Sequence, residues 1–168
     1  KFEGDVSEGL INSNKVLLLK PRTFMNDSGK SVRDAANFYK IPPAKIVVFH
    51  DELDLAPGRI RAKTGGGVAG HNGLKNIAQH LGQDFRRVRI GIGHPGDKDR
   101  VTGYVLADFS RLDMDWLGST IAAIAEASPF LLQGADAQFM TKLASILNPA
   151  DKIKDLSHSQ SNDPEDNS

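Results

Sequence analysis

The hydrophobic positions of this 168-residue chain fall into short runs and helical repeats that alternate along the sequence. Residues 16–19 and 46–49 are continuous apolar runs, which are typical of strands buried on both faces of a sheet. Residues 59–63 and 87–92 instead alternate polar and apolar side chains, which predicts more exposed strands.

Elsewhere, apolar side chains recur at intervals of three and four residues, the spacing of an amphipathic helix. This spacing predicts helices around residues 32–39, 74–81, 116–125 and 137–147. Ile41-Pro42-Pro43 ends the first helix, and Gly82 follows the second, where helices commonly terminate. Strands interleaved with helices predict an α/β fold: a single-domain mixed, mostly parallel sheet with helices on both faces.

The predicted domain spans residues 1–149. After Pro149 the chain is polar and rich in Ser, Asp and Asn, with almost no apolar residue beyond Leu156. We therefore expect residues 150–168 to form a disordered tail. No apolar run approaches membrane-spanning length, so no membrane association is expected.

Charge is distributed unevenly although the formal net charge is zero. Residues 59–100 contain nine Lys or Arg and three Asp, a local excess of six positive charges. Such a field suits nucleic-acid phosphates, although an ordinary solvated surface can have the same composition. The absence of cysteine excludes disulfides, thiol catalysis and thiolate metal sites.

A glycine-rich loop stands directly before the second predicted helix. Gly65-Gly66-Gly67 and Gly70 carry no Cβ, so backbone N–H groups there can closely approach an anion or a developing oxyanion. The same loop delivers His71 and Asn72 to the helix start. The composition also fits a plain tight turn. A nucleotide-binding loop is a weaker interpretation, because no Lys and Ser/Thr follow the glycines as in a P-loop.

His50 and Asp51 directly follow a predicted strand, at the end where open α/β sheets bind ligands. Acidic residues at such positions are often only loop caps. Glu52, Asp54 and two further histidines extend the cluster, but the spacings match no metal signature. We therefore expect no metal here.

Four segments, in their order and spacing, resemble the bacterial-type peptidyl-tRNA hydrolase family. They are residues 21–29 (PRTFMNDSG), 50–55 (HDELDL), 64–74 (TGGGVAGHNGL) and 89–96 (RIGIGHPG). The resemblance implies an enzyme without metal or cofactor that hydrolyses the ester between peptide and tRNA. It would recycle the tRNA of peptidyl-tRNA released from or stalled on ribosomes during translation. It also implies a monomer that acts in the cytoplasm and binds the tRNA acceptor end.

The resemblance assigns roles to individual residues. Asp51 matches a carboxylate that orients a general-base histidine, and Asn26 matches an amide that holds the attacking water and the substrate's 3′ end. These two are the expected catalytic residues. His71 is either a second site histidine or a loop residue that bonds its own backbone. The expected substrate-binding residues are Phe24, Met25, Asn26, Asn72 and His71.

The nucleophile is expected to be water, because the chain has neither cysteine nor a G-x-S-x-G motif.

Within the basic segment of residues 59–100, four residues are expected to contact tRNA phosphates. They are Lys63, Arg89, Lys98 and Arg100.

The family pattern opens with a strand carrying Gly-x-x-Asn-Pro-Gly, then a tyrosine and the catalytic histidine, and this sequence contains none of them. We expect the general base to be absent from the chain as written, no other imidazole to align with Asp51, and the sequence to be truncated. A naturally short chain would instead be a non-catalytic, RNA-binding relative that acts in RNA splicing with a protein partner.

Overall fold

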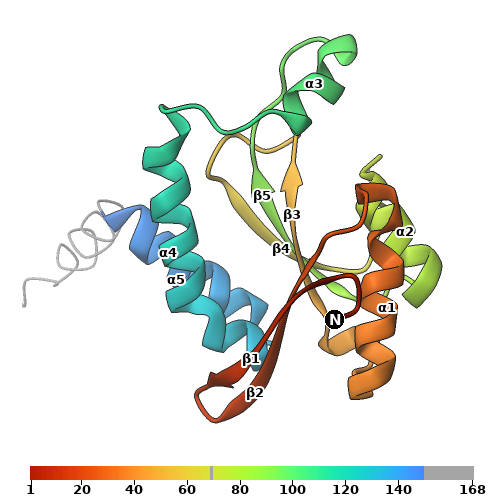
Figure 1. Ribbon diagram of the computed structural model, residues 1–168. Coiled ribbons are helices and arrows are strands. Elements are labelled where there is room, and N and C mark those ends of the chain that lie inside the picture. Colours follow the sequence, from red (N-terminus) through yellow and green to blue (C-terminus); the bar gives the residue numbers. More distant parts are fainter. Residues whose placement is uncertain (69, 150–168) are drawn as a thin grey trace, which may run out of the picture. The chain divides into compact units, whose positions relative to one another are not determined.

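The computed structural model describes residues 1–68 and 70–149 (Figure 1). It divides into two compact units, the first of residues 1–102 and the second beginning at residue 103. The predicted disordered tail lies outside the described residues, so that expectation and the 1–149 domain boundary stay predictions. Within the described ranges, no helix is long and apolar enough to cross a membrane.

A three-stranded sheet forms the centre of the first unit. Its strands are β3 (Val47–Glu52), β4 (Ile60–Thr64) and β5 (Arg86–Gly91), in the order β3-β5-β4. Strand β5 pairs parallel with β3 and antiparallel with β4. All three strands lie where the hydrophobic pattern predicts them.

A separate hairpin contains the other predicted strand. Strands β1 (Gly4–Ile11) and β2 (Asn14–Pro21) pair antiparallel with each other alone. Asn12 and Ser13 both have positive φ at the turn between them, as a type I′ turn requires. The hydrophobic pattern did not predict β1.

The expectation of strands buried on both faces is wrong. Leu18 in β2 is 61% exposed, because β2 belongs to a two-stranded ribbon. Phe49 in β3 is 47% exposed. A continuous apolar run predicts a strand here but not the burial of both its faces.

The mixed α/β class is confirmed, but the sheet is not mostly parallel. Among the described strands, one pair is parallel and two pairs are antiparallel. The reason is connection length. The β1–β2 turn is too short for the crossover that parallel neighbours need. The segment from β3 to β4 is likewise too short to return the chain to the same end of the sheet, so β4 runs opposite to β3 and to β5, which lies between them.

Two helices of the first unit pack side by side (Figure 1). They are α1 (Ser28–Tyr39) and α2 (Asn72–Leu81), as the spacing predicts. Leu74 and Ile77 of α2 form a buried cluster with Phe85, and Val32 of α1 and Val48 of β3 pack against it. The two helices therefore cover the face of the sheet to which Val48 points. Helices on the opposite face stay a prediction.

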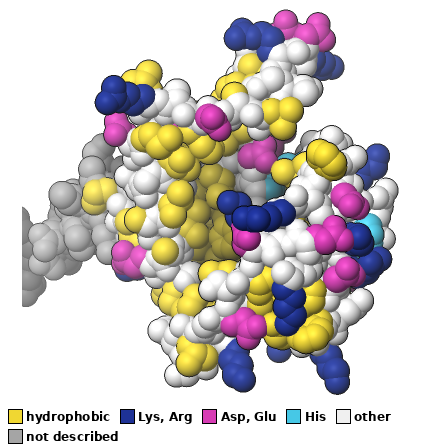
Figure 2. All heavy atoms as spheres, viewed as in Figure 1, with side chains coloured by type: hydrophobic (Ala, Val, Ile, Leu, Met, Phe, Trp, Pro, Cys, Tyr) yellow, Lys and Arg dark blue, Asp and Glu magenta, His cyan; other side chains and the backbone are white. Residues whose placement is uncertain are grey.

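The second unit is helical. Helices α4 (Asp113–Leu132) and α5 (Asp136–Leu147) match the two predicted C-terminal helices and pack against each other. Their buried side chains include Ala127, Phe139 and Leu143. Hydrophobic side chains also gather on the visible surface of this unit (Figure 2), and Met114 and Ile121 are more than half exposed. The short helix α3 (Val101–Leu106), which the pattern did not predict, spans the boundary between the units in sequence.

Candidate active site

The candidate site begins at the carboxyl end of β3. Side chains alternate across a strand, so His50 and Glu52 point to the face covered by α1 and α2 and are buried. Asp51 lies between them and remains partly exposed. The parallel register places His50 beside Arg89 of β5. This strand therefore brings a carboxylate to an accessible position directly beside a buried imidazole.

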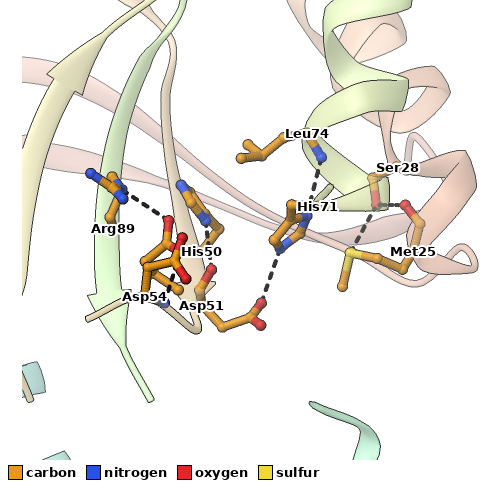
Figure 3. Close-up of polar contacts among 9 residues, drawn as sticks. Met25, Ser28, His50, Asp51, Asp54, His71, Leu74 and Arg89 are labelled. Atoms are coloured by element: carbon orange, nitrogen blue, oxygen red, sulfur yellow. Dashed lines mark hydrogen bonds and ion pairs between the residues drawn. The ribbon is translucent and has the colours of Figure 1, made fainter. Parts of the chain in front are cut away.

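Asp51 binds the imidazole of His71 (Figure 3). The distance from Asp51 Oδ1 to His71 Nε2 is 3.0 Å. This hydrogen bond lowers the pKa of Asp51 against the opposing effect of burial, so the carboxylate is the favoured form. The expectation that no imidazole of this chain aligns with Asp51 is wrong, because the end of β3 lies beside the start of α2.

His71 is also the N-cap of α2. Its Nδ1 accepts a hydrogen bond from the backbone N–H of Leu74 at 3.3 Å. A neutral imidazole has one donor nitrogen and one acceptor nitrogen. Because Nδ1 accepts here, Nε2 carries the proton and donates a hydrogen bond to the Asp51 carboxylate. The structure thus combines the two alternatives for His71: it bonds the local backbone and belongs to the polar site.

His50 completes a compact group of side chains. Its Nδ1 lies 2.7 Å from the carbonyl oxygen of Asp51, and its ring meets the His71 ring edge to face at a centroid distance of 5.1 Å. Its Nε2 is buried without a hydrogen-bond partner in the described structure. Burial lowers the pKa of His50, so the neutral ring is favoured.

These contacts do not change the expectation that the acidic and histidine cluster binds no metal. The described residues hold no group of three or more His, Asp or Glu side chains that could bind a metal ion. Glu52, one member of the cluster, has other partners: Arg89 and the backbone N–H of Asp54. The absence of metal and of any cofactor stays a prediction.

The segment Phe24-Met25-Asn26 reaches the same region from the start of α1. Met25 and Asn26 belong to the 3₁₀ helix η1 (Met25–Asp27), which packs against α2. A Cβ at Gly73 would lie 2.5 Å from the sulfur of Met25 and 3.1 Å from Cε1 of His71. Gly73 therefore lets the thioether of Met25, one of the expected substrate-binding residues, approach the His71 ring.

The contact between the helices that carry these segments is close. Asn76 of α2 accepts a hydrogen bond from the backbone N–H of Gly29 at 2.6 Å. A Cβ at Gly29 would lie 2.4 Å from the Asn76 carbonyl oxygen, so only glycine fits there. This contact fixes the beginning of α1 against α2, and with it the position of the preceding η1.

The two predicted asparagines lie on the accessible side of this arrangement. Asn26 and Asn72 are both exposed. Asn72 opens α2 directly after His71, and Asn26 follows Met25 in η1. Asn26 is not the N-cap of α1, because Asp27 takes that position. Asn72 thus adjoins His71, and Asn26 adjoins Met25, whose sulfur lies near the His71 ring. That both amides share one cleft with Asp51 stays a prediction.

The four predicted phosphate contacts fall into two environments. Lys63 in β4 is exposed, as are Lys98 and Arg100 in η3 (Lys98–Arg100). Arg89 instead donates to the buried carboxylate of Glu52 at 2.9 Å. Burial works to raise the pKa of Glu52, but Asp54 N–H and Arg89 together lower it. Arg89 therefore has a structural partner that the sequence did not reveal.

Comparison with known proteins places the chain in a family. The family model described as "Peptidyl-tRNA hydrolase" matches residues 1–152. The peptidyl-tRNA hydrolase of Parvibaculum lavamentivorans is 57% identical over 92% of this chain and 76% of its own length. That of Bradyrhizobium diazoefficiens is 52% identical over 85% of this chain and 71% of its own.

A solved structure agrees with these matches. The crystal structure of peptidyl-tRNA hydrolase from Acinetobacter baumannii matches with a TM-score of 0.79 and 45% identity, over 84% of this chain and 72% of that one. These matches support an enzyme and give no support to the splicing alternative. The chain belongs to the peptidyl-tRNA hydrolase family.

Proposed function

We propose that this chain supplies the site at which water hydrolyses the ester between a peptide and the terminal ribose of tRNA. The observation that carries the proposal is the Asp51–His71 pair, which stands beside Met25. Asn26 directly follows Met25 in the chain, and Asn72 directly follows His71. The reaction frees the tRNA of peptidyl-tRNA released from or stalled on ribosomes for further translation. The family membership supports this substrate.

Asp51 acts as the carboxylate of a carboxylate–imidazole pair. Such a carboxylate fixes the tautomer of its partner and stabilises the imidazolium as it forms. Asn26 holds the attacking water and the substrate's 3′ end, because an amide offers donor and acceptor together and stays neutral. Phe24 and Met25 form the adjoining substrate surface, and Asn72 binds on the tRNA side.

We propose that His71 is not the general base. The one free lone pair of neutral His71 lies on Nδ1 and accepts from Leu74 N–H, so His71 can take a proton from water only by giving up its helix cap. We propose that His71 positions Asp51 and the substrate. The base in this proposal is the histidine of the family pattern, which the sequence as written does not contain, acting next to the same carboxylate.

The deciding experiment compares two chains in a peptidyl-tRNA hydrolysis assay. One is residues 1–168, and the other is the same chain extended at its N-terminus by the family's strand and histidine. The extended chain should hydrolyse the substrate and residues 1–168 should not, because a general base contributes roughly 10²–10⁴-fold. Replacing the added histidine by alanine should abolish activity and preserve the thermal unfolding transition. Robust turnover by residues 1–168 would make His71 or His94 the base.

Lys63, Arg89, Lys98 and Arg100 contact phosphates of the tRNA in this proposal. Three of the four are exposed, and all lie in the basic segment of residues 59–100. Phosphate contacts orient the acceptor end without reading its sequence. The enzyme is proposed to act as a monomer in the cytoplasm, where ribosomes release this substrate. Sedimentation equilibrium and cell fractionation test those two statements.

A further inference from the structure

The most deeply buried basic side chain of the described structure lies beneath the glycine loop. Arg87 of β5 is 4% exposed. Its Nη1 donates to the carbonyl oxygen of Gly67 at 2.8 Å, and its Nη2 donates to those of Gly66, at 2.7 Å, and Gly65. One guanidinium therefore holds three consecutive carbonyl groups of the loop.

These carbonyl groups are the hydrogen-bond acceptors of the Arg87 guanidinium, whose Cζ also lies 5.8 Å from the centroid of the Phe85 ring. Within the described residues, no carboxylate forms an ion pair with Arg87, and its Nε is buried without a hydrogen-bond partner. Burial lowers the pKa of Arg87, but an arginine stays charged. A buried cation is costly unless its donors are satisfied. The loop must therefore turn its carbonyl groups inward for the guanidinium to remain buried.

The backbone of the loop adopts a conformation that suits this contact. Gly65 has φ of 63° and Gly66 has φ of 84°, a region that side chains with a Cβ rarely occupy. Gly66 and Gly67 are both exposed. The inward carbonyl groups and the positive φ values thus define one particular shape for residues 65–67.

The shape of the loop determines where Lys63 lies. A Cβ at Gly66 would come within 2.8 Å of both Cε and Nζ of Lys63, so the lysine side chain lies directly along the glycine. Lys63 and Arg87 are paired in the β4–β5 register, so their side chains leave the sheet on the same side. The same Cβ would also lie 3.5 Å from Nη2 of Arg87, so the loop at Gly66 contacts both cations.

We infer that Arg87 is a positioning residue for substrate binding: it clamps residues 65–67 so that Lys63 is presented to a tRNA phosphate. The inference rests on the proposed function, because that proposal gives Lys63 its ligand. Arg87 itself makes no phosphate contact. Its guanidinium is bound by the carbonyl groups of the loop, whereas the proposed phosphate contacts Lys63, Lys98 and Arg100 are exposed.

A double-mutant cycle tests this assignment by measuring tRNA binding over a range of salt concentrations. Arg87→Lys keeps the charge but loses the three-carbonyl fork. It should weaken binding about tenfold and reduce the salt slope by about one, as Lys63→Ala should. The double variant should bind no more weakly than Lys63→Ala alone, because both changes remove the same contact.

The matched control is Arg61→Lys. Arg61 lies on the same face of β4 and is exposed, and among the described residues its side chain donates only to the carbonyl of its neighbour Ile60. It should bind tRNA like the parent chain. Binding by Arg87→Lys at the parent level would overturn the inference. Additive losses in the double variant would do so too, because they would make Arg87 an independent phosphate contact.

Amide hydrogen exchange without RNA separates this inference from the proposed function. Arg87→Lys should accelerate exchange at Gly65, Gly66 and Gly67 and leave the amides of α4 and α5 unchanged. Unchanged exchange in the loop would refute the clamp. A parent chain that binds no tRNA would refute the proposed function, and the exchange result would still decide the role of Arg87.

Gly66→Ala serves if Arg87→Lys does not fold. It leaves Arg87 intact but strains the exposed loop at positive φ and displaces Lys63. It should reproduce the weaker binding and the smaller salt slope with a normal thermal transition. Binding like that of the parent chain would show that the loop shape does not matter to Lys63.

Discussion

The two sides of the candidate site differ in how far their structure is already fixed. On the β3 side, Asp51, His71 and His50 contact one another, and His50 is 9% exposed. On the η1 side, Phe24 is 86% exposed and Met25 is 56% exposed. The first side is arranged before any ligand arrives, as catalytic groups must be. The second presents apolar surface that a bound substrate would cover.

Because of this difference, substitutions on the two sides should affect different properties of the protein. Alterations on the β3 side should affect turnover, stability or their pH dependence, because those groups depend on one another. Alterations on the η1 side and at the basic surface should affect binding and leave the fold intact. The following changes test that division, from the largest expected effect to the smallest.

Asp51→Asn should produce the largest loss. Removing the charge abolishes support for an imidazolium, so turnover of peptidyl-tRNA should fall by roughly 10²–10⁴-fold, while tRNA affinity changes little. Single-turnover kinetics in a chain that carries the general base, together with equilibrium tRNA binding, measure the two effects separately. Asp54→Asn, an exposed carboxylate three residues further on, is the control and should retain activity. A parallel loss of affinity would contradict the assignment.

Arg89→Met should cause the largest loss of stability. It leaves the carboxylate of Glu52 buried without its cation, so the unfolding free energy in urea should fall by about 3 kcal/mol. The double variant with Glu52→Gln should recover part of that loss. Arg61→Met changes the exposed arginine paired with Arg89 across β4–β5 and should cost under about 0.5 kcal/mol. A similarly small cost for Arg89→Met would free Arg89 for a primary role at phosphates.

Local patterns predicted much of this arrangement. The alternation in β4 and β5 and the three-and-four spacing in α1 and α2 depend on neighbouring residues alone, so their positions follow from the sequence. The end of β3 was likewise predictable as a ligand-binding position. The glycine-rich loop separately predicted a site at the start of α2.

The contacts between distant segments could not be predicted in the same way. Asp51 and His71 are 20 positions apart, and their hydrogen bond depends on how α2 packs against the sheet. The clamp from Arg87 to residues 65–67 depends on the β4–β5 register. Leu18 shows the opposite failure: its apolar run looks buried, but its strand pairs only within a hairpin.

Phe24→Ala should separate binding from folding on the η1 side. Because the ring is exposed, its loss should change the unfolding free energy by less than about 0.5 kcal/mol. Affinity for the substrate should fall by about 1–3 kcal/mol if the ring stacks on a base at the 3′ end. Phe38→Ala, another exposed aromatic, is the control and should bind normally. Unchanged binding by Phe24→Ala would place the 3′ end elsewhere.

His50→Gln should alter the pH dependence of stability on the β3 side. Burial lowers the pKa of His50 in the folded chain, so the unfolded chain binds its proton first as the pH falls. The unfolding free energy should therefore decrease below about pH 6.5, by at most about 1.4 kcal/mol per pH unit. Urea unfolding at pH 7.5 and 5.5 should show a smaller difference in His50→Gln than in the parent or in the control His80→Gln. Equal differences would exclude His50 as the source.

The smallest effect is expected at the exposed basic residues of η3. Lys98→Ala and Arg100→Ala each remove one charge from the surface and disturb no ion pair found in the described structure, so stability should not change. Each should weaken binding of all tRNAs alike and reduce the salt slope by about one. The exposed Lys75→Ala, on α2, is the control for general surface charge. A loss confined to one tRNA, or an unchanged slope, would mean that η3 reads something other than phosphates. The exposed part of the site would then contribute specificity as well as affinity.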